Sequence, residues 1–308
     1  MNRLWYTIAA VMVLAGLAHL GLLLVDGGPW DGPVSWRKPF TFGVSFGLSV
    51  ATLAWVTGLA GLRPRPRGTL VGVFTAASAI ELTLITMQAW RGVPSHFNFA
   101  TGFDSLVSAT LAAGGLVLVV VTICATVAVS RRSPGVAPSV LLAVRAGFGT
   151  LLASMAFGAL MIAQGVTQAR SGHQDAAYTV AAALKPAHAV LMHGVLLLPA
   201  LAWLAGRTLP EERQRLRLVR LALGAYVVVA GVVCGLSLAG VTAAAPATAS
   251  VLSAGAVSTA AVAALLWPHP RVAVDGRGHG RREKLRRGLE PMVAQWHPTR
   301  SQHQKGLM

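Results

Sequence analysis

Residues 105–129 read SLVSATLAAGGLVLVVVTICATVAV, and none of these 25 side chains is charged. A bilayer core about 30 Å thick is crossed by roughly 20 apolar residues in a helix. The stretch is therefore long and apolar enough to span a membrane. It also predicts the class of the whole chain, because similar stretches recur on both sides of it.

Eight such apolar runs divide most of the 308 residues. They lie at about 4–25, 39–62, 69–90, 105–129, 140–164, 186–206, 217–240 and 249–267. Only 12% of the chain is charged, whereas soluble domains are about 25% charged. We therefore expect an all-α membrane protein, with a bundle of about eight transmembrane helices over residues 1–268.

Basic residues are concentrated in alternate loops. The loops after the second, fourth and sixth runs carry Arg63, Arg65 and Arg67; Arg131 and Arg132; and Arg207, Arg213 and Arg215. The loops after the other runs are close to neutral. Since cytoplasmic loops carry an excess of Lys and Arg, this alternation predicts a bacterial inner-membrane protein with both termini in the cytoplasm.

Residues 269–308 differ in composition from the rest of the chain. They hold nine Lys or Arg against three acidic residues, within a formal net charge of +16. We expect a mostly disordered cytoplasmic tail. It either adheres to anionic lipid headgroups or is a solvated tail that only reinforces the topology. Nucleic-acid binding is not expected, because no motif or aromatic platform accompanies the charge.

Two distant segments share a pattern. Lys-Pro pairs at 38–39 and 185–186 open the second and sixth runs, and Trp55 and Trp203 lie near the other ends. A 4+4 parallel repeat would produce this likeness. Two helices that independently place Pro in the first turn and Trp at the interface would produce it as well.

Two Gly-x-x-x-Gly motifs predict close helix packing. They are Gly43 with Gly47 in the second run and Gly231 with Gly235 in the seventh. Small residues spaced in this way lie on one helical face, so each motif is expected to let a neighbouring backbone approach closely.

Glu81 is the acidic residue that lies well inside a predicted span. A carboxylate near the middle of a bilayer costs a few kcal/mol, so such residues are functional by default. Glu81 is interpreted as a proton-carrying acid, a ligand contact or a counter-ion. The alternative is a protonated acid that only forms a hydrogen bond to a neighbouring helix.

Polar side chains are dense in the stretch from Gln88 to Asn98, where Gly92 and Pro94 require a turn. The stretch is either a capping loop that lines a cavity or a surface loop, and Asp104 or Ser105 is expected to cap the following helix. The predicted ligand-binding residues are Glu81, Gln88, Arg91, Ser95, His96, Asn98, Arg37, Lys38 and Lys185.

Histidines within the spans suggest a second kind of site. His19 lies in the first span, and His188 and His193 lie in the sixth, where Met192 shares a face with His188. One histidine from each span would suit axial ligation of haem. The alternative is that each imidazole forms a hydrogen bond to a facing helix. No zinc-binding pattern such as His-Glu-x-x-His occurs, so no metal site is predicted.

With the predicted topology, most of these polar residues lie in the outer half of the membrane. We therefore expect a polar cavity that opens to the extracytoplasmic side and binds a small ligand or a redox cofactor such as haem. A proton-coupled transporter using Glu81 and a non-catalytic assembly or sensory protein are the alternatives. Enzymatic activity, a homo-oligomer and a membrane partner stay open.

Three segments carry a resemblance. They are Trp36-Arg37-Lys38-Pro39-Phe40, the Arg-Gly-x-x-Ser-His-Phe-Asn motif at 91–98, and His188-x-x-x-Met192-His193 leading to Leu198-Pro199 and Trp203. Together they resemble a family of uncharacterised bacterial polytopic membrane proteins with no established activity. The resemblance covers the first six spans and implies an integral membrane protein, with no implication for its substrate.

Overall fold

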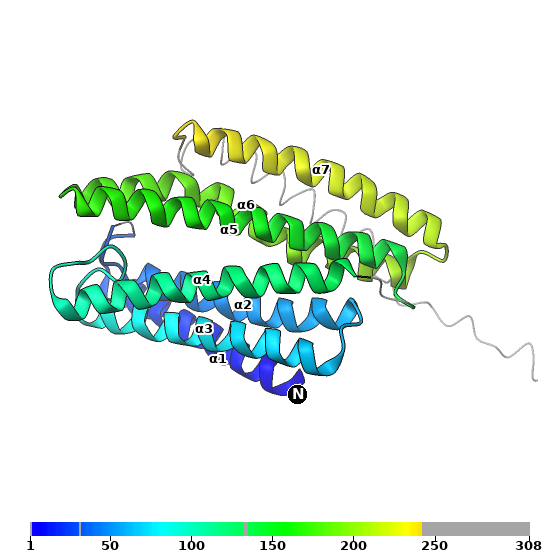
Figure 1. The fold of residues 1–308 in the computed structure, drawn as a ribbon, viewed down its shortest axis with the longest axis horizontal. Coiled ribbons are helices and arrows are strands. Elements are labelled where there is room, and N and C mark those ends of the chain that lie inside the picture. The colour runs from blue at the N-terminus through cyan, green and yellow to red at the C-terminus, as the bar shows by residue number, and fades with distance from the viewer. Residues whose placement is uncertain (1, 31, 132–134, 242–308) are drawn as a thin grey trace, which may run out of the picture. The chain divides into compact units, whose positions relative to one another are not determined.

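The computed structural model describes residues 2–30, 32–131 and 135–241, and the regular structure in them is entirely helical (Figure 1). The helices are α1 (Asn2–Asp26), α2 (Arg37–Leu59), α3 (Pro64–Trp90), α4 (Gly102–Ser130), α5 (Pro138–Arg170), α6 (Gln174–Thr208) and α7 (Glu212–Leu238). Each of these seven is long and apolar enough to cross a membrane. The chain is therefore a multi-pass helical membrane protein.

Seven of the predicted spans coincide with these helices. The predicted eighth span, 249–267, and the basic tail, 269–308, lie outside the described residues, so the total of eight helices stays a prediction. Consecutive helices pack against each other and run in opposite directions. We call the end at which α3 finishes the Trp90 end and the end at which it begins the Arg63 end.

Helix α6 begins earlier than the sequence indicates. It starts at Gln174, and Pro186 lies inside it, so the expectation that the Lys-Pro pair opens this helix is wrong. Residues 176–183 precede the predicted span 186–206 and include five alanines. Alanine has the highest helix propensity, so the helix extends beyond the apolar run. Its 35 residues would extend about 52 Å, which exceeds the thickness of a bilayer with its headgroups.

Helices α2 and α6 contact each other through the segments that share the Lys-Pro and Trp pattern. The rings of Trp55 and Trp203 meet edge to face, with 6.2 Å between their centroids. Near the Trp90 end, Lys38 and Lys185 are close enough for their like charges to repel. The two similar segments thus lie side by side, and the 4+4 repeat itself stays a prediction.

Close backbone packing occurs at one of the two Gly-x-x-x-Gly motifs. A Cβ atom built on Gly43 would lie 2.7 Å from the Cα of Gly16 in α1, and one on Gly47 would lie 2.6 Å from a backbone oxygen of α1. Gly231 and Gly235 have no such neighbour within 4 Å in the described part of the chain. The prediction is confirmed for the first motif only.

Arginines at the Arg63 end bind carbonyl groups at the C-terminal ends of the preceding helices. The pairs are Arg67 of α3 with the carbonyl oxygen of Ala54, Arg145 of α5 with that of Val129, and Arg215 of α7 with that of Leu209. The contacts to Val129 and Leu209 satisfy carbonyl groups at helix ends that lack an intrahelical partner, whereas Ala54 lies about one turn inside α2. A positive charge near the end of a helix also favours the helix dipole. These arginines therefore hold the helical hairpins closed.

The Gly43 contact gives a first prediction. Gly43→Ala is expected to destabilise the protein by about 1–3 kcal/mol, because the added methyl group overpacks the α1–α2 contact. Gly231→Ala gains the same helix propensity without the clash and serves as the matched control. Thermal unfolding in detergent, followed by circular dichroism, would show a lower Tm for Gly43→Ala alone. Equal Tm values for the two variants would contradict the assigned contact.

Candidate functional site

A closed polar network joins the end of α3 to the start of α4. The Oδ1 atom of Asp104 accepts hydrogen bonds from Nε2 of Gln88 at 2.9 Å and from Nη1 of Arg91 at 2.7 Å. Arg91 also donates to the amide oxygen of Gln88, and Gln88 is fully buried. The predicted ligand-binding residues Gln88 and Arg91 therefore lie together, with their polar groups bound to each other and to Asp104.

Asp104 is a member of this network that the sequence analysis did not select. Its Oδ2 atom accepts a hydrogen bond from the hydroxyl of Thr101 at 2.7 Å, and that hydroxyl accepts one from the backbone N–H of Asp104. Thr101 is therefore the N-cap of α4, and the expectation of Asp104 or Ser105 is wrong. The Thr-x-x-Asp spacing resembles a capping box and is the signal that could have identified both residues.

Ser95 and Asn98 hold the shape of the loop that follows α3. The Ser95 hydroxyl lies 3.0 Å from Nδ1 of His96. The Asn98 side chain donates to the carbonyl of Pro94 at 3.2 Å and accepts from the N–H of Ala100 at 3.1 Å. Both are buried, so these predicted site residues form bonds within the loop.

Phe97 anchors the same loop to α5 and α6. Its backbone has a φ of 59°, a left-handed conformation that is uncommon for a residue with a bulky side chain. The buried ring lies where a Cβ atom on Gly165 of α5 would clash with it. The Tyr178 hydroxyl of α6 donates to the carbonyl of His96 at 2.8 Å. The loop is therefore packed into the bundle rather than free on its surface.

A group of positive charges lies beside this loop. Arg37 and Lys38 occupy the first turn of α2, and Lys185 of α6 is near enough to repel Lys38. The ammonium of Lys38 lies 5.8 Å from the centroid of the Tyr178 ring. No carboxylate in the described part of the chain forms an ion pair with Lys38, although this side chain is partly buried.

His96 is a neutral neighbour of these charges. Burial, together with the positive charge of Lys38, lowers the pKa of His96 from 6.5 to about 3. Its ring lies 5.8 Å from that of Phe42 and 6.1 Å from that of Phe97, measured between centroids. At neutral pH it therefore adds aromatic surface and hydrogen-bonding capacity without charge.

His19 has hydrogen-bond partners at both ring nitrogens. Nδ1 lies 2.7 Å from the carbonyl oxygen of Ala15, which identifies Nδ1 as the protonated nitrogen. Nε2 then accepts the indole N–H of Trp90 at 3.3 Å. The ring also lies 5.9 Å from that of Trp36. His19 thus belongs to an aromatic cluster at the ends of α1 and α3.

The histidines of α6 lie in different surroundings. Nδ1 of His188 donates to the backbone carbonyl of Ser154 in α5 at 2.8 Å, and the Ser154 hydroxyl donates to the carbonyl of His188 at 2.8 Å. Met192 packs against the main apolar core, and His193 is exposed, with Nδ1 bound to its own helix. His19 and His188 therefore contact different helices. The described residues contain no group of three metal-ligating side chains.

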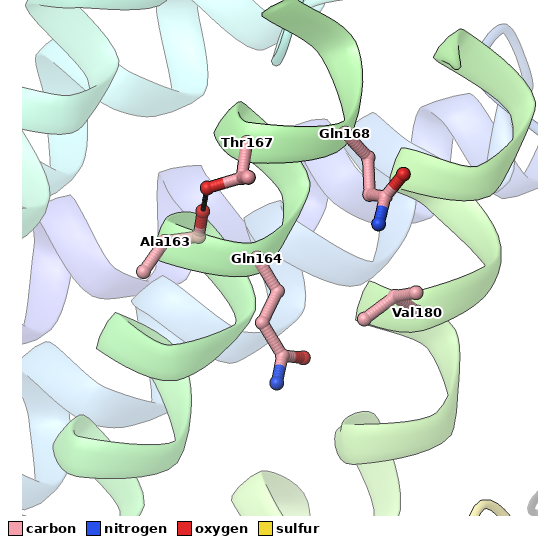
Figure 2. A pocket seen from close by; sticks show the side chains of 5 residues that line it. All are labelled: Ala163, Gln164, Thr167, Gln168 and Val180. Atoms are coloured by element: carbon pink, nitrogen blue, oxygen red, sulfur yellow. Dashed lines mark hydrogen bonds between the residues drawn. The ribbon is translucent and has the colours of Figure 1, made fainter. Parts of the chain in front are cut away.

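An open depression lies between α5 and α6 towards the Trp90 end (Figure 2). It has a volume of about 390 Å³ and is lined by Ala163, Gln164, Thr167, Gln168 and Val180. The sequence analysis did not select these residues. The pair Gln164 and Gln168, four residues apart near the end of the predicted span 140–164, is the sequence signal that could have identified this depression.

Comparisons of the chain with protein-family models, curated proteins and solved structures find no match. Its function is therefore inferred from its own residues and their geometry.

The polar network gives a prediction for Asp104. Asp104→Asn is expected to lower the Tm by a few degrees, because it leaves Arg91 without its counter-ion. Asp26→Asn changes an exposed carboxylate at the same end of the bundle and is the control. Thermal unfolding of both variants in detergent is the measurement. The assigned network would be wrong if Asp104→Asn unfolded at the same temperature as Asp26→Asn.

The pKa of His96 gives a prediction about pH. Between pH 6.5 and about 3 the unfolded chain binds a proton at this residue that the folded protein excludes. Stability is therefore expected to fall as the pH is lowered through this window, by at most about 1.4 kcal/mol per pH unit. His96→Gln should make the dependence shallower in unfolding curves recorded from pH 7 to pH 4. An unchanged slope would refute the assignment.

Proposed function

We propose that this membrane protein binds a small organic anion at its Trp90 end, between α2, α6 and the loop after α3. The observation that carries the proposal is the partly buried ammonium of Lys38, which has neither a hydrogen bond nor an ion pair to the described residues. Arg37 and Lys185 add positive charge nearby. A buried cation is stable when a negative charge accompanies it, and a bound anion would supply that charge.

The surroundings of Lys38 favour an anion with an apolar or aromatic body. A continuous row of rings runs from Phe42 through His96 and Phe97 to Tyr178, with neighbouring centroids 5.8–6.1 Å apart. Ligand sites are commonly lined by such apolar and aromatic surface, with a few polar groups that fix orientation. An aromatic carboxylate has both features. Its charge would approach Lys38 while its ring packs against this row.

The location of the site follows from the distribution of arginines. The Arg63 end carries Arg63, Arg65 and Arg67 at the start of α3 and Arg213 and Arg215 at the start of α7. The positive-inside rule assigns this end to the cytoplasm of a bacterial inner membrane. The proposed site at the Trp90 end would then open to the extracytoplasmic side. Adhesion of the tail to anionic lipid headgroups stays a prediction.

Haem ligation is the alternative that uses His19 and His188. It requires Nε2 of His19 to lose the hydrogen bond from Trp90, and it requires His188, whose Nδ1 is bound to α5, to reach the same iron. The absorption spectrum of the purified protein separates the two functions. A Soret band that disappears in His19→Ala would favour haem over the anion.

Anion binding is testable with benzoate as the probe. We expect saturable binding of benzoate to the purified protein in nanodiscs, measured by calorimetry, and at least a tenfold loss of affinity in Lys38→Gln. Arg65→Gln removes a cation from the opposite end and should bind as the wild type does. Inorganic phosphate tests whether charge alone is sufficient, and we expect it to bind more weakly. Equal affinities of Lys38→Gln and Arg65→Gln would exclude the site.

A further inference from the structure

Glu81 is a buried carboxyl group without a hydrogen-bond partner among the residues that the structure describes. Its residue exposure is 5%, and its Oε1 atom receives no hydrogen bond. Ser78, three residues earlier on the same face of α3, is fully buried, and its hydroxyl also has no partner. Buried polar groups are nearly always paired, so two adjacent exceptions within one membrane span require an explanation.

The carboxyl group of Glu81 packs against the α4 backbone at Gly114, which has no side chain. A Cβ atom built on Gly114 would lie 2.7 Å from Oε1 and 3.0 Å from Cγ, so a side chain at residue 114 would force the Glu81 side chain to move. A Cβ atom on the adjacent Gly115 would lie 4.0 Å from the same oxygen, which is an ordinary contact. Gly114 therefore shapes the carboxyl site, and Gly115 does not.

No charged group in the described part of the chain stabilises an ionised Glu81. Arg91 on α3 and Asp104 on α4 lie ten residues from Glu81 and from Gly114 respectively, or about 15 Å along each helix. The buried side chains of Ile85, Val107 and Leu111 form an apolar cluster between these levels. No other titratable group on these helices acts on Glu81. Those of α1 to α4 are Arg3, Tyr6, His19, Asp26, Arg37, Lys38, Arg65, Arg67 and Cys124.

We propose that Glu81 is a proton-binding site in the membrane, with Gly114 as its positioning residue. An unpaired carboxylate in this apolar space would be several kcal/mol less stable than the neutral acid. The site therefore holds a proton at neutral pH. Loss of that proton requires water to reach the carboxylate, and α3 and α4 must separate at Gly114 to admit it. This site is independent of the anion site at Lys38.

Dicyclohexylcarbodiimide is a suitable probe because it is apolar and reacts with the acid form of a carboxyl group. The carboxyl O–H adds across one C=N bond to give an O-acylisourea, which rearranges to a stable N-acylurea without a leaving group. The labelled peptide therefore gains the full mass of the reagent. In wild-type protein in nanodiscs, mass spectrometry is expected to locate the label on Glu81, and Asp104 is the internal control that stays unlabelled.

The pH profile of the labelling rate tests proton release. Raising the pH from about 6 to about 10 should reduce the rate at least tenfold, since deprotonation removes the reactive form. Glu81→Gln should lose the label. Absence of the label from Glu81 in the wild type would overturn the proposal. A rate independent of pH in this range would overturn it as well, because it describes an acid that does not release its proton between about pH 6 and about pH 10.

Two adjacent glycines provide the matched comparison. Gly114→Ala pushes the carboxyl group out of its space and loosens the α3–α4 contact, so the midpoint of its pH profile should move to lower pH. Gly115→Ala adds the same methyl group next to it and should keep the wild-type midpoint. If both variants retain that midpoint, the assigned site is wrong. Labelling of the wild type gives an answer even if either variant fails to fold.

Discussion

The absence of water from the bilayer core is the constraint on which this structure depends, since each polar group there needs a partner within the protein. Helices satisfy their own backbone along most of their length. Side chains bind the groups left unpaired at helix ends, as Arg145 does for the carbonyl of Val129 at the end of α4. Ser154 and His188 satisfy each other across α5 and α6 by the same principle. Most of the polar residues inside the spans thus have a structural explanation.

The exceptions identify the functional candidates. Arg91 and Lys38 are both cations at the Trp90 end, but Asp104 neutralises only the first. Asp104 is paired with Arg91, whereas Glu81 has neither a cation nor a hydrogen-bond donor beside it in the described part of the chain. A composition-based list of polar residues cannot separate these cases. These residues are distinguished by whether the fold places an ion-pair or hydrogen-bond partner beside each side chain.

The sequence predicted the spans well because hydropathy depends on residue type alone, and it predicted less of the site because pairing depends on geometry. The Arg91–Asp104 pair requires the turn of the intervening loop, which includes a left-handed Phe97 that no residue preference indicates. The roles of His19 required knowledge of the facing helix and of the protonated nitrogen. Gly114 became informative only when α4 was placed against Glu81.

The arginine contacts at the Arg63 end also bear on the order of assembly. Each joins residues separated by a single turn between helices, such as Arg145 with Val129 or Arg215 with Leu209. A helical hairpin can therefore close its own end as soon as its second helix has entered the membrane. The three hairpins α2–α3, α4–α5 and α6–α7 can then form in sequence during synthesis, each complete before the next emerges. Helix α1 has no such contact with the other described helices, and it is held instead by the glycine faces that meet at Gly16 and Gly43.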